Sequence, residues 1–346
     1  MKTLRSVSEK AHVSVATASR VLNGTRTIVP ISEKTRRKVL EAADGLDYQP
    51  NIFAKCLRLK KSFTIGLVMS NIEDYFFGPI IRGIEKILQP NGYHFIIVDA
   101  EDSGEKELLC VEDLLKRRVD GVLVVGVPVV GCREEGEARL KEKGIPSVFV
   151  ARQTNNNAPC VIVDNERGGF LATEHLILLG HRRIGFLSGP PLQPDGISRL
   201  AGYRKAFKKY GVPLRDDLIV AMDDATPLPQ TGYKAMMRKF SRKQTDMTAC
   251  FAYNDLLAMG ALTAMAAKKR NIPEDFSIVG FDDILTASYF VPPLTTVRQP
   301  LEEMGRKAAS LLLDIISKQS NGDDAGRKIV LQPELMIRKT TAKMAA

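Results

Sequence analysis

The feature that most constrains the fold is a regular alternation of short apolar runs with longer helical segments, which begins at residue 63. The runs cover residues 64–69, 93–98, 119–125, 146–150, 161–163, 184–188, 249–253 and 277–281. Strands that alternate with helices build a parallel sheet with helices on both faces. Because roughly 280 residues exceed one compact doubly wound unit, we expect an α/β body of two similar subdomains with a cleft between them.

The residues before this α/β region carry most of the net charge. Residues 1–61 contain thirteen Lys or Arg and five Asp or Glu, a net charge of +8, whereas the whole chain carries +10. A small basic module on a nearly neutral body is typical of a nucleic-acid-binding domain. A basic solubilising tail or an arm for anionic membranes is the alternative, but such segments lack the apolar helical periodicity of this region.

Three hydroxyl residues in the basic region stand where helices would begin. Thr3, Ser14 and Ser32 each precede a stretch with helical spacing of apolar residues, and Ser or Thr at this position accepts a backbone N–H of the first turn. Asn23 and Gly24 are typical of a helix end. We expect helices over residues 4–11, 15–22 and about 33–46. The first two, joined by a tight turn, predict a helix-turn-helix domain within a small all-α head.

The second of these helices has one apolar face and one face suited to DNA. Val15, Ala16, Thr17, Ser19 and Arg20 point outward if the apolar face packs inward. Arg20 can donate two hydrogen bonds to guanine O6 and N7, Thr17 and Ser19 can bind phosphates, and Val15 and Ala16 can contact a thymine methyl. An ordinary solvated arginine is the alternative for Arg20.

A short helical stretch connects the head to the body. Residues 48–51 interrupt the third helix, and residues 52–58 are long enough for about two helical turns. Because so short an isolated helix is marginal in water, it should fold only when something holds it, for example the DNA target. We therefore divide the chain into a head (1–49), a hinge helix and linker (50–62) and a body (63–346).

Polar side chains follow the strand-like runs of the body, where ligands of open parallel sheets bind. They are Ser70, Asn71, Asp99, Arg152, Asp164, Asn165, Asn254, Asp255, Asp282 and Asp283, with Arg199 opening a later helix. Tyr75, Phe76, Phe77, Tyr253 and Phe281 stand close by. Planar polar groups beside flat apolar faces suit a polyhydroxylated ring, so a sugar fits best. Asn165, Asp255 and Asp283 fit a structural role equally well.

Signals for catalysis, metals and membranes are missing from the sequence. It contains no GxGxxG, GxxxxGK[ST], HExxH or GxSxG motif, and its four histidines are scattered. Asp282 and Asp283 are adjacent on an extended segment and should point to opposite sides. Five scattered cysteines without a CxxC pair fit free thiols. We expect no catalytic residues, no metal and no cofactor, and a cytoplasmic protein, since no signal peptide or membrane span is visible.

Three segments of the head and linker resemble the lactose/galactose repressor family of bacterial transcription regulators. They are VSVATASRVLNG (13–24), TRRKV (35–39) and LDYQPNIFAKCL (46–57). The resemblance implies that Val15, Ala16 and Arg20 read bases and that Leu57 wedges into the minor groove at the operator centre. It also implies that Asn23, Asn51 and Ala54 belong to the DNA-binding surface. The match continues to about residue 340 and implies a periplasmic-binding-protein-like body.

The same resemblance identifies candidate effector-binding residues in the body. SRLAGYRKAF (198–207), AYNDLLAMGAL (252–262) and VGFDD (279–283) match family segments that bind the effector through, here, Arg199, Asn254 and Asp282. The full set of predicted effector-binding residues is Ser70, Phe76, Ile80, Arg152, Val163, Arg199, Tyr253, Asn254, Asp282 and Gln299. Sugar-binding relatives often have aspartate where this chain has Ala151, so Arg152 without that acceptor admits an acidic or phosphorylated sugar.

These observations predict a DNA-binding transcriptional repressor controlled by a sugar or sugar-derived metabolite. It would act as a homodimer on a near-palindromic double-stranded operator, since two heads meet two half-sites. The resemblance implies three crossings between subdomains, near Val163, Arg298 and Asp324. The first subdomain would hold about 63–163 and 299–324, and the second about 164–298 and 325–340. A free-standing sugar-binding protein or a sugar-processing enzyme is the alternative, and the sign of regulation stays open.

Overall fold

The computed structural model describes residues 3–22, 30–49, 56, 59, 61–126, 135–154, 158–191, 193–222, 226–241, 245–318 and 326–344. The chain forms two compact units, Met1–Ser62 and Phe63–Ala346. The boundary between them coincides with the predicted start of the α/β body.

The first unit contains the three predicted helices, α1 (Leu4–Lys10), α2 (Val15–Leu22) and α3 (Glu33–Asp44). All three predicted N-caps are confirmed, because the hydroxyl oxygens of Thr3, Ser14 and Ser32 accept the backbone N–H of Ser6, Thr17 and Thr35 at 3.2, 3.0 and 3.2 Å. The helices bury a small core. Its buried residues are Val7, Ala11, Ala18, Val21, Val39, Ala42 and Ala43.

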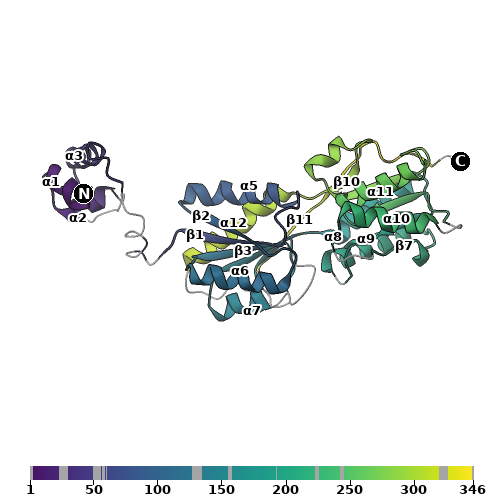
Figure 1. The fold of residues 1–346 in the computed structure, drawn as a ribbon, viewed down its shortest axis with the longest axis horizontal. Helices are drawn as coiled ribbons and strands as arrows, with labels where there is room; N and C mark the ends of the chain where they lie inside the picture. The colour runs from purple at the N-terminus through teal and green to yellow at the C-terminus, as the bar shows by residue number, and fades with distance from the viewer. Residues whose placement is uncertain are drawn as a thin grey trace. The chain divides into compact units, whose positions relative to one another are not determined.

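The second unit contains two six-stranded sheets (Figure 1). The first sheet is parallel throughout, in the order β11 (Lys328–Leu331), β5 (Cys160–Val163), β4 (Ser147–Val150), β3 (Gly121–Val125), β1 (Thr64–Met69) and β2 (His94–Asp99). Helices α5 (Phe77–Leu88) and α12 (Leu301–Lys318) pack on one face. Helices α6 (Gly104–Lys116) and α7 (Glu135–Glu142) pack on the other.

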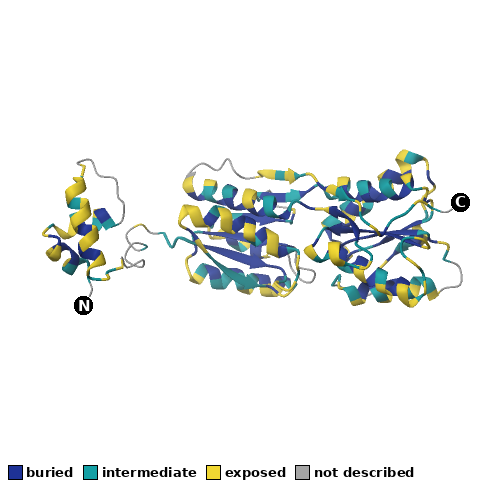
Figure 2. Cartoon of the chain, turned by 90° about the horizontal axis from the view of Figure 1, so that it is seen from above, coloured by how far each residue is buried: buried dark blue, intermediate teal, exposed yellow. Residues whose placement is uncertain are grey.

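The second sheet has the order β12 (Glu334–Met336), β10 (Thr295–Arg298), β9 (Ser277–Asp282), β8 (Ala249–Ala252), β6 (Ile184–Leu187) and β7 (Ile219–Val220). Only the edge strand β12 is antiparallel, to β10. Helices α8 (Asn165–Leu178) and α9 (Pro194–Tyr210) cover one face, and α10 (Pro229–Ser241) and α11 (Asp255–Ala267) the other. Figure 2 shows that the strands are the most deeply buried part of both subdomains.

The chain crosses between the two sheets three times, at two of the predicted places. It leaves the first sheet after Val163 and returns to it after Arg298, where α12 begins at Leu301. The third crossing was expected near Asp324, and this prediction is wrong. β11 pairs with β5, so residues 328–331 belong to the first subdomain and the chain crosses at 332–333, between β11 and β12.

His181 and the cysteines have no part in the polar set that follows the strands. His181 has a packing role, because its ring nitrogens lie 3.1 and 3.2 Å from the hydroxyls of Thr248 and Ser277. The cysteines that the structure describes, Cys56, Cys110, Cys160 and Cys250, are free thiols. Within the described ranges, no helix is both long and apolar enough to cross a membrane.

Candidate functional site

Helix α2 presents the predicted DNA-reading side chains on its outer face. Val15, Ala16 and Arg20 are exposed, and Thr17 and Ser19 are partly exposed, while Ala18 and Val21 pack into the core of the head. The outward orientation predicted from the apolar periodicity is therefore confirmed. The predicted contacts of Asn23, Asn51, Ala54 and Leu57 lie outside the described residues, as does the hinge helix 52–58 apart from Cys56.

A cavity of about 320 Å³ lies at the carboxyl ends of the strands, between the two sheets of the body. The first subdomain contributes segments that follow β1, β2 and β3, and the second contributes segments that follow β6, β8 and β9. The polar strand-end residues of the sequence thus converge, as the parallel topology requires. The predicted residues among its lining are Ser70, Phe76, Val163, Arg199, Tyr253, Asn254, Asp282 and Gln299.

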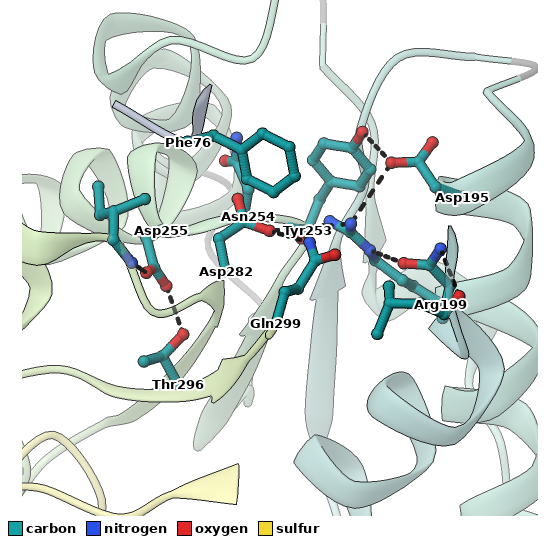
Figure 3. A network of polar contacts seen from close by, with 12 residues as sticks. Phe76, Asp195, Arg199, Tyr253, Asn254, Asp255, Asp282, Thr296 and Gln299 are labelled. Atoms are coloured by element: carbon teal, nitrogen blue, oxygen red, sulfur yellow. Dashed lines mark hydrogen bonds and ion pairs between the residues drawn. The ribbon is translucent and has the colours of Figure 1, made fainter. Parts of the chain in front are cut away.

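Arg199, on α9, is the cation of this cavity, and several elements fix its side chain (Figure 3). Its Nε donates to Asn165 Oδ1 at 2.9 Å, and Nη1 donates to the backbone oxygen of Tyr253 at 2.6 Å. Its Nη2 lies 3.4 Å from Asp195 Oδ2 and 3.8 Å from Asp282 Oδ1. The guanidinium also lies against the rings of Tyr253 and Phe281. Its orientation is therefore set before any ligand binds.

Asp282 ends β9 and lies beside Arg199 in the cavity. Its Oδ1 accepts a hydrogen bond from Gln299 Nε2 at 2.7 Å, and its backbone φ of 113° is one that side-chain-bearing residues rarely adopt. Burial raises the pKa of Asp282 to about 7, in spite of the favourable charge of Arg199 and with a further rise from Asp74. Strain and burial of this kind are concentrated at functional sites.

Asn254 and Tyr253 connect this cavity to the second sheet. Asn254 Oδ1 caps α11 by accepting the backbone N–H of Leu257 at 2.9 Å, so the residue has a structural role besides lining the cavity. The Tyr253 hydroxyl donates to Asp195 Oδ2 at 2.6 Å. Figure 3 shows the Phe76 and Tyr253 rings on the same side of Asp282 and Gln299. Their flat faces provide the apolar part of the site.

Asp255 and Asp283, for which a structural role was the alternative, have that role. Asp255 is fully buried and accepts hydrogen bonds from the Thr296 hydroxyl at 2.5 Å and the backbone N–H of Ile284 at 2.9 Å. The Asp283 carboxylate lies 2.7 Å from Arg298 and 2.6 Å from Arg338. As predicted, the adjacent Asp282 and Asp283 face different partners.

Two predicted cavity residues lie elsewhere. Ile80 is fully buried in the core between α5, α12 and the first sheet, so it does not line the cavity. Arg152 also lies outside this lining and borders a neighbouring cavity of about 330 Å³. Its Nη1 lies 2.9 and 2.8 Å from the two carboxylate oxygens of Glu107 on α6. The lack of an acceptor at Ala151 therefore leaves no uncompensated charge, and the argument for an acidic or phosphorylated sugar is wrong.

Four acidic residues that line the cavity, Glu73, Asp74, Asp102 and Asp195, were not predicted from the sequence. Asp195 lies four residues before Arg199 on the same helix, a spacing that could have identified it. Asp74 stands between the predicted Ser70 and Phe76, and Asp102 follows β2. Burial raises the pKa of both Asp74 and Asp102. Over the described ranges, no three His, Cys, Asp or Glu side chains form a metal-binding group.

Comparisons with known proteins agree with the description of the head and with that of the body. Residues 3–51 match the family described as "Bacterial regulatory proteins, lacI family", and residues 173–341 match "Periplasmic binding protein-like domain". The chain is 32% identical to the HTH-type transcriptional repressor PurR of Haemophilus influenzae (strain PittEE), over 98% of each chain.

Solved structures extend the likeness to the whole fold. The lac repressor dimer bound to operator and the anti-inducer ONPF has a TM-score of 0.83 and 28% identity, with 98% of this chain and 99% of that chain covered. The complex of the transcriptional regulator CelR with cellobiose has a TM-score of 0.73 and 32% identity, with 98% of this chain and 100% of that chain covered. These relatives are regulators of transcription, not enzymes.

Proposed function

Because the chain belongs to the lacI family of bacterial regulatory proteins and is a DNA-binding regulator with a ligand-binding effector domain, we propose that it is a repressor whose operator affinity is set by a sugar in the cavity. The observation that carries the proposal is the placement of Arg199 and Asp282 beside the rings of Phe76 and Tyr253. Bidentate polar groups next to flat apolar faces suit the hydroxyls and CH faces of a sugar ring.

The size of the cavity and the relatives support this ligand class. A volume of about 320 Å³ is at the lower end of small-molecule sites, which suits a compact polar ligand. The similar regulator CelR was solved with cellobiose, a sugar. Polar side chains that are already held in place lower the cost of ordering the site on binding.

The DNA-binding half of the proposal rests on α2. Arg20 is the residue for guanine recognition, Val15 and Ala16 add apolar contacts, and Thr17 and Ser19 bind phosphates. Residues 50–62, with Asn51, Ala54 and Leu57, would connect the head to the body and contact the operator centre, and Asn23 would contact DNA at the end of α2. Effector binding that changes the closure of the two subdomains would alter how two heads meet their half-sites.

A homodimer is supported by exposed apolar side chains in one segment of the second subdomain. Leu285 and Tyr289 on η3 (Leu285–Tyr289) are 78% and 77% exposed, and Val291 just after it is 94% exposed. Large apolar side chains in such a position are typical of a protein interface. A two-fold axis through this face would match a near-palindromic operator.

The dimer can be tested by placing charges on this face. Tyr289→Asp together with Val291→Asp should convert the dimer into a monomer, measured by sedimentation velocity, and should lower operator affinity. Leu178→Asp, at an exposed apolar residue on α8 of the same subdomain, is the matched control. A double variant that sediments like the unaltered protein would refute this interface.

The function itself is tested by finding the operator and then the ligand. Selection of binding sites from random double-stranded DNA should return a two-fold symmetric sequence, and fluorescence anisotropy then measures affinity for it. A panel of sugars should contain a compound that changes this affinity and raises the midpoint of thermal unfolding. Selection of an asymmetric site, or no response to any sugar, would contradict the corresponding half of the proposal.

A further inference from the structure

The cavity contains more carboxylates than cations. Among the residues that the structure describes, five acidic residues and one basic residue line the cavity. The acidic residues are Glu73, Asp74, Asp102, Asp195 and Asp282, and the basic one is Arg199. A ligand that binds here therefore enters a site of net negative charge.

Arg199 compensates only the carboxylates of the second subdomain. Its Nη2 lies near both Asp195 and Asp282, at 3.4 and 3.8 Å. Two carboxylates of the first subdomain have neutral donors instead. Asp74 Oδ1 accepts the backbone N–H of Phe76 at 2.9 Å, and Asp102 Oδ2 accepts Asn71 Nδ2 at 2.8 Å. Neutral donors satisfy hydrogen bonding but leave the charge in place.

The carboxylates of the two subdomains act on each other across the cavity. The charge of Asp74, from the first subdomain, raises the pKa of Asp282, from the second, and it also raises the pKa of Asp102. Repulsion between like charges at the two walls opposes approach of the subdomains. A positive charge placed between the walls would remove this repulsion and attract both sides.

The apolar walls also suit a cation. The rings of Tyr75, Phe76 and Tyr253 line the cavity, and aromatic faces attract positive charge as well as the CH groups of a sugar. An anionic sugar would meet only Arg199, whose charge Asp195 and Asp282 already compensate. A neutral sugar would leave the charges of Asp74 and Asp102 without a counter-charge.

We propose that the effector is a sugar that carries a positively charged amino group, with the ammonium bound between Asp74 and Asp282 and the hydroxyls bound by Arg199, Asn254 and Gln299. This inference rests on the proposed function and specifies its ligand class. The ammonium would bridge the two subdomains, so the same contact that gives specificity would favour their closure.

The experiment compares amino sugars with their parent sugars on the full-length protein. The probes are D-glucosamine, D-galactosamine and D-mannosamine against glucose, galactose and mannose, with glucuronate and glucose 6-phosphate as anions. Calorimetric titration should show that at least one amino sugar binds about tenfold tighter or more than its parent, and that the anions bind more weakly than either.

Two variants test whether the Asp74 carboxylate, in the first subdomain, causes the preference for an amino sugar. Asp74→Asn keeps an oxygen for the Phe76 N–H but removes the charge, so the amino sugar should lose about tenfold or more in affinity while its parent sugar changes little. Asp314→Asn, an exposed aspartate on α12, is the control for loss of a charge elsewhere and should alter neither affinity.

The outcomes separate this inference from the proposed function. Equal or tighter binding of neutral or anionic sugars refutes the ammonium site but leaves a sugar-controlled repressor intact. An amino-sugar preference that survives in Asp74→Asn also refutes the site. Failure of every probe to bind, with operator binding retained, refutes the inference together with the sugar part of the proposed function.

Discussion

Two buried arginines of the body, Arg152 in the first subdomain and Arg199 in the second, differ in the arrangement of their counter-ions. Each side chain is about 5% exposed or less, and each lies beside an aromatic ring. Arg152 is held by both oxygens of one carboxylate at under 3 Å, whereas Arg199 donates to neutral oxygens and has carboxylates at 3.4 and 3.8 Å. Burial and charge are therefore common to the structural Arg152 and to Arg199, for which we propose ligand binding, and only their partners distinguish them.

Removing the partner of Arg152 should have the largest effect on stability. Glu107→Gln removes the carboxylate that pairs with the buried guanidinium of Arg152 at 2.8 Å, and breaking a buried pair in this way costs about 3–5 kcal/mol of unfolding free energy. Urea denaturation measures the loss. The double variant Glu107→Gln, Arg152→Met should recover part of it, because both charges of the pair are then removed. A loss below about 1 kcal/mol in the single variant would mean that solvent compensates Arg152.

Asp282 should make the unfolding free energy fall as pH rises, whereas the carboxylate of an ordinary ion pair makes it rise. Its pKa is raised from 3.8 to about 7, so between these values the native state holds a proton that the unfolded chain has released. The unfolding free energy should therefore fall as pH rises from 4 to 7, by up to about 4 kcal/mol from this group, and level off above 7.

Asp282→Asn tests this contribution. The variant should show a shallower decrease in unfolding free energy than the unaltered protein when denaturation is followed from pH 4 to 8. Arg199, Asp195, Asp74 and Asp255 face Asp282 and are unchanged in the variant. Asp74, Asp102 and Asp255 also have raised pKa values, so a residual decrease should persist. Identical slopes for the two proteins would show that Asp282 is ionised throughout this range.

Replacing Arg199 should weaken ligand binding, whereas breaking the Arg152–Glu107 pair should not. Arg199→Ala should weaken effector binding about a hundredfold, equal to about 2.7 kcal/mol, because the hydroxyls of the ligand lose a charged donor. Calorimetric titration with the effector found in the sugar panel measures this, and Glu107→Gln should retain the affinity. A similar loss of effector affinity in Arg199→Ala and Glu107→Gln would contradict the different roles that we give to Arg199 and Arg152.

The same contrast explains what the sequence could and could not predict. Asp195 and Arg199 are one helical turn apart, and Ser70, Asn254 and Asp282 each follow a strand, so local spacing and parallel topology indicate the cavity. The partner of Arg152 lies 45 residues earlier, on another element, and nothing near Arg152 indicates it. A prediction from Ala151 alone therefore gave Arg152 the wrong role.

The strands also differ in how well the sequence predicts them. The buried strands β1, β3 and β9 contain apolar runs that the sequence shows plainly. The edge strands β7, β11 and β12 have two to four residues and are partly exposed, so they lack that signal. Because β11 was not predicted, the third crossing between subdomains was placed too early in the chain.

A third arginine, Arg20, extends the comparison to an exposed site. It has none of the burial that fixes Arg152 and Arg199, so its contribution should be seen only against DNA. Arg20→Ala should leave the unfolding free energy unchanged within about 0.5 kcal/mol and weaken specific operator binding by about 1–3 kcal/mol per half-site. Fluorescence anisotropy, measured with operator and with random DNA at one salt concentration, separates a contact of Arg20 with a base from a contact with a phosphate. Loss on operator alone supports recognition of a base, whereas equal loss on both DNAs would assign Arg20 to a phosphate.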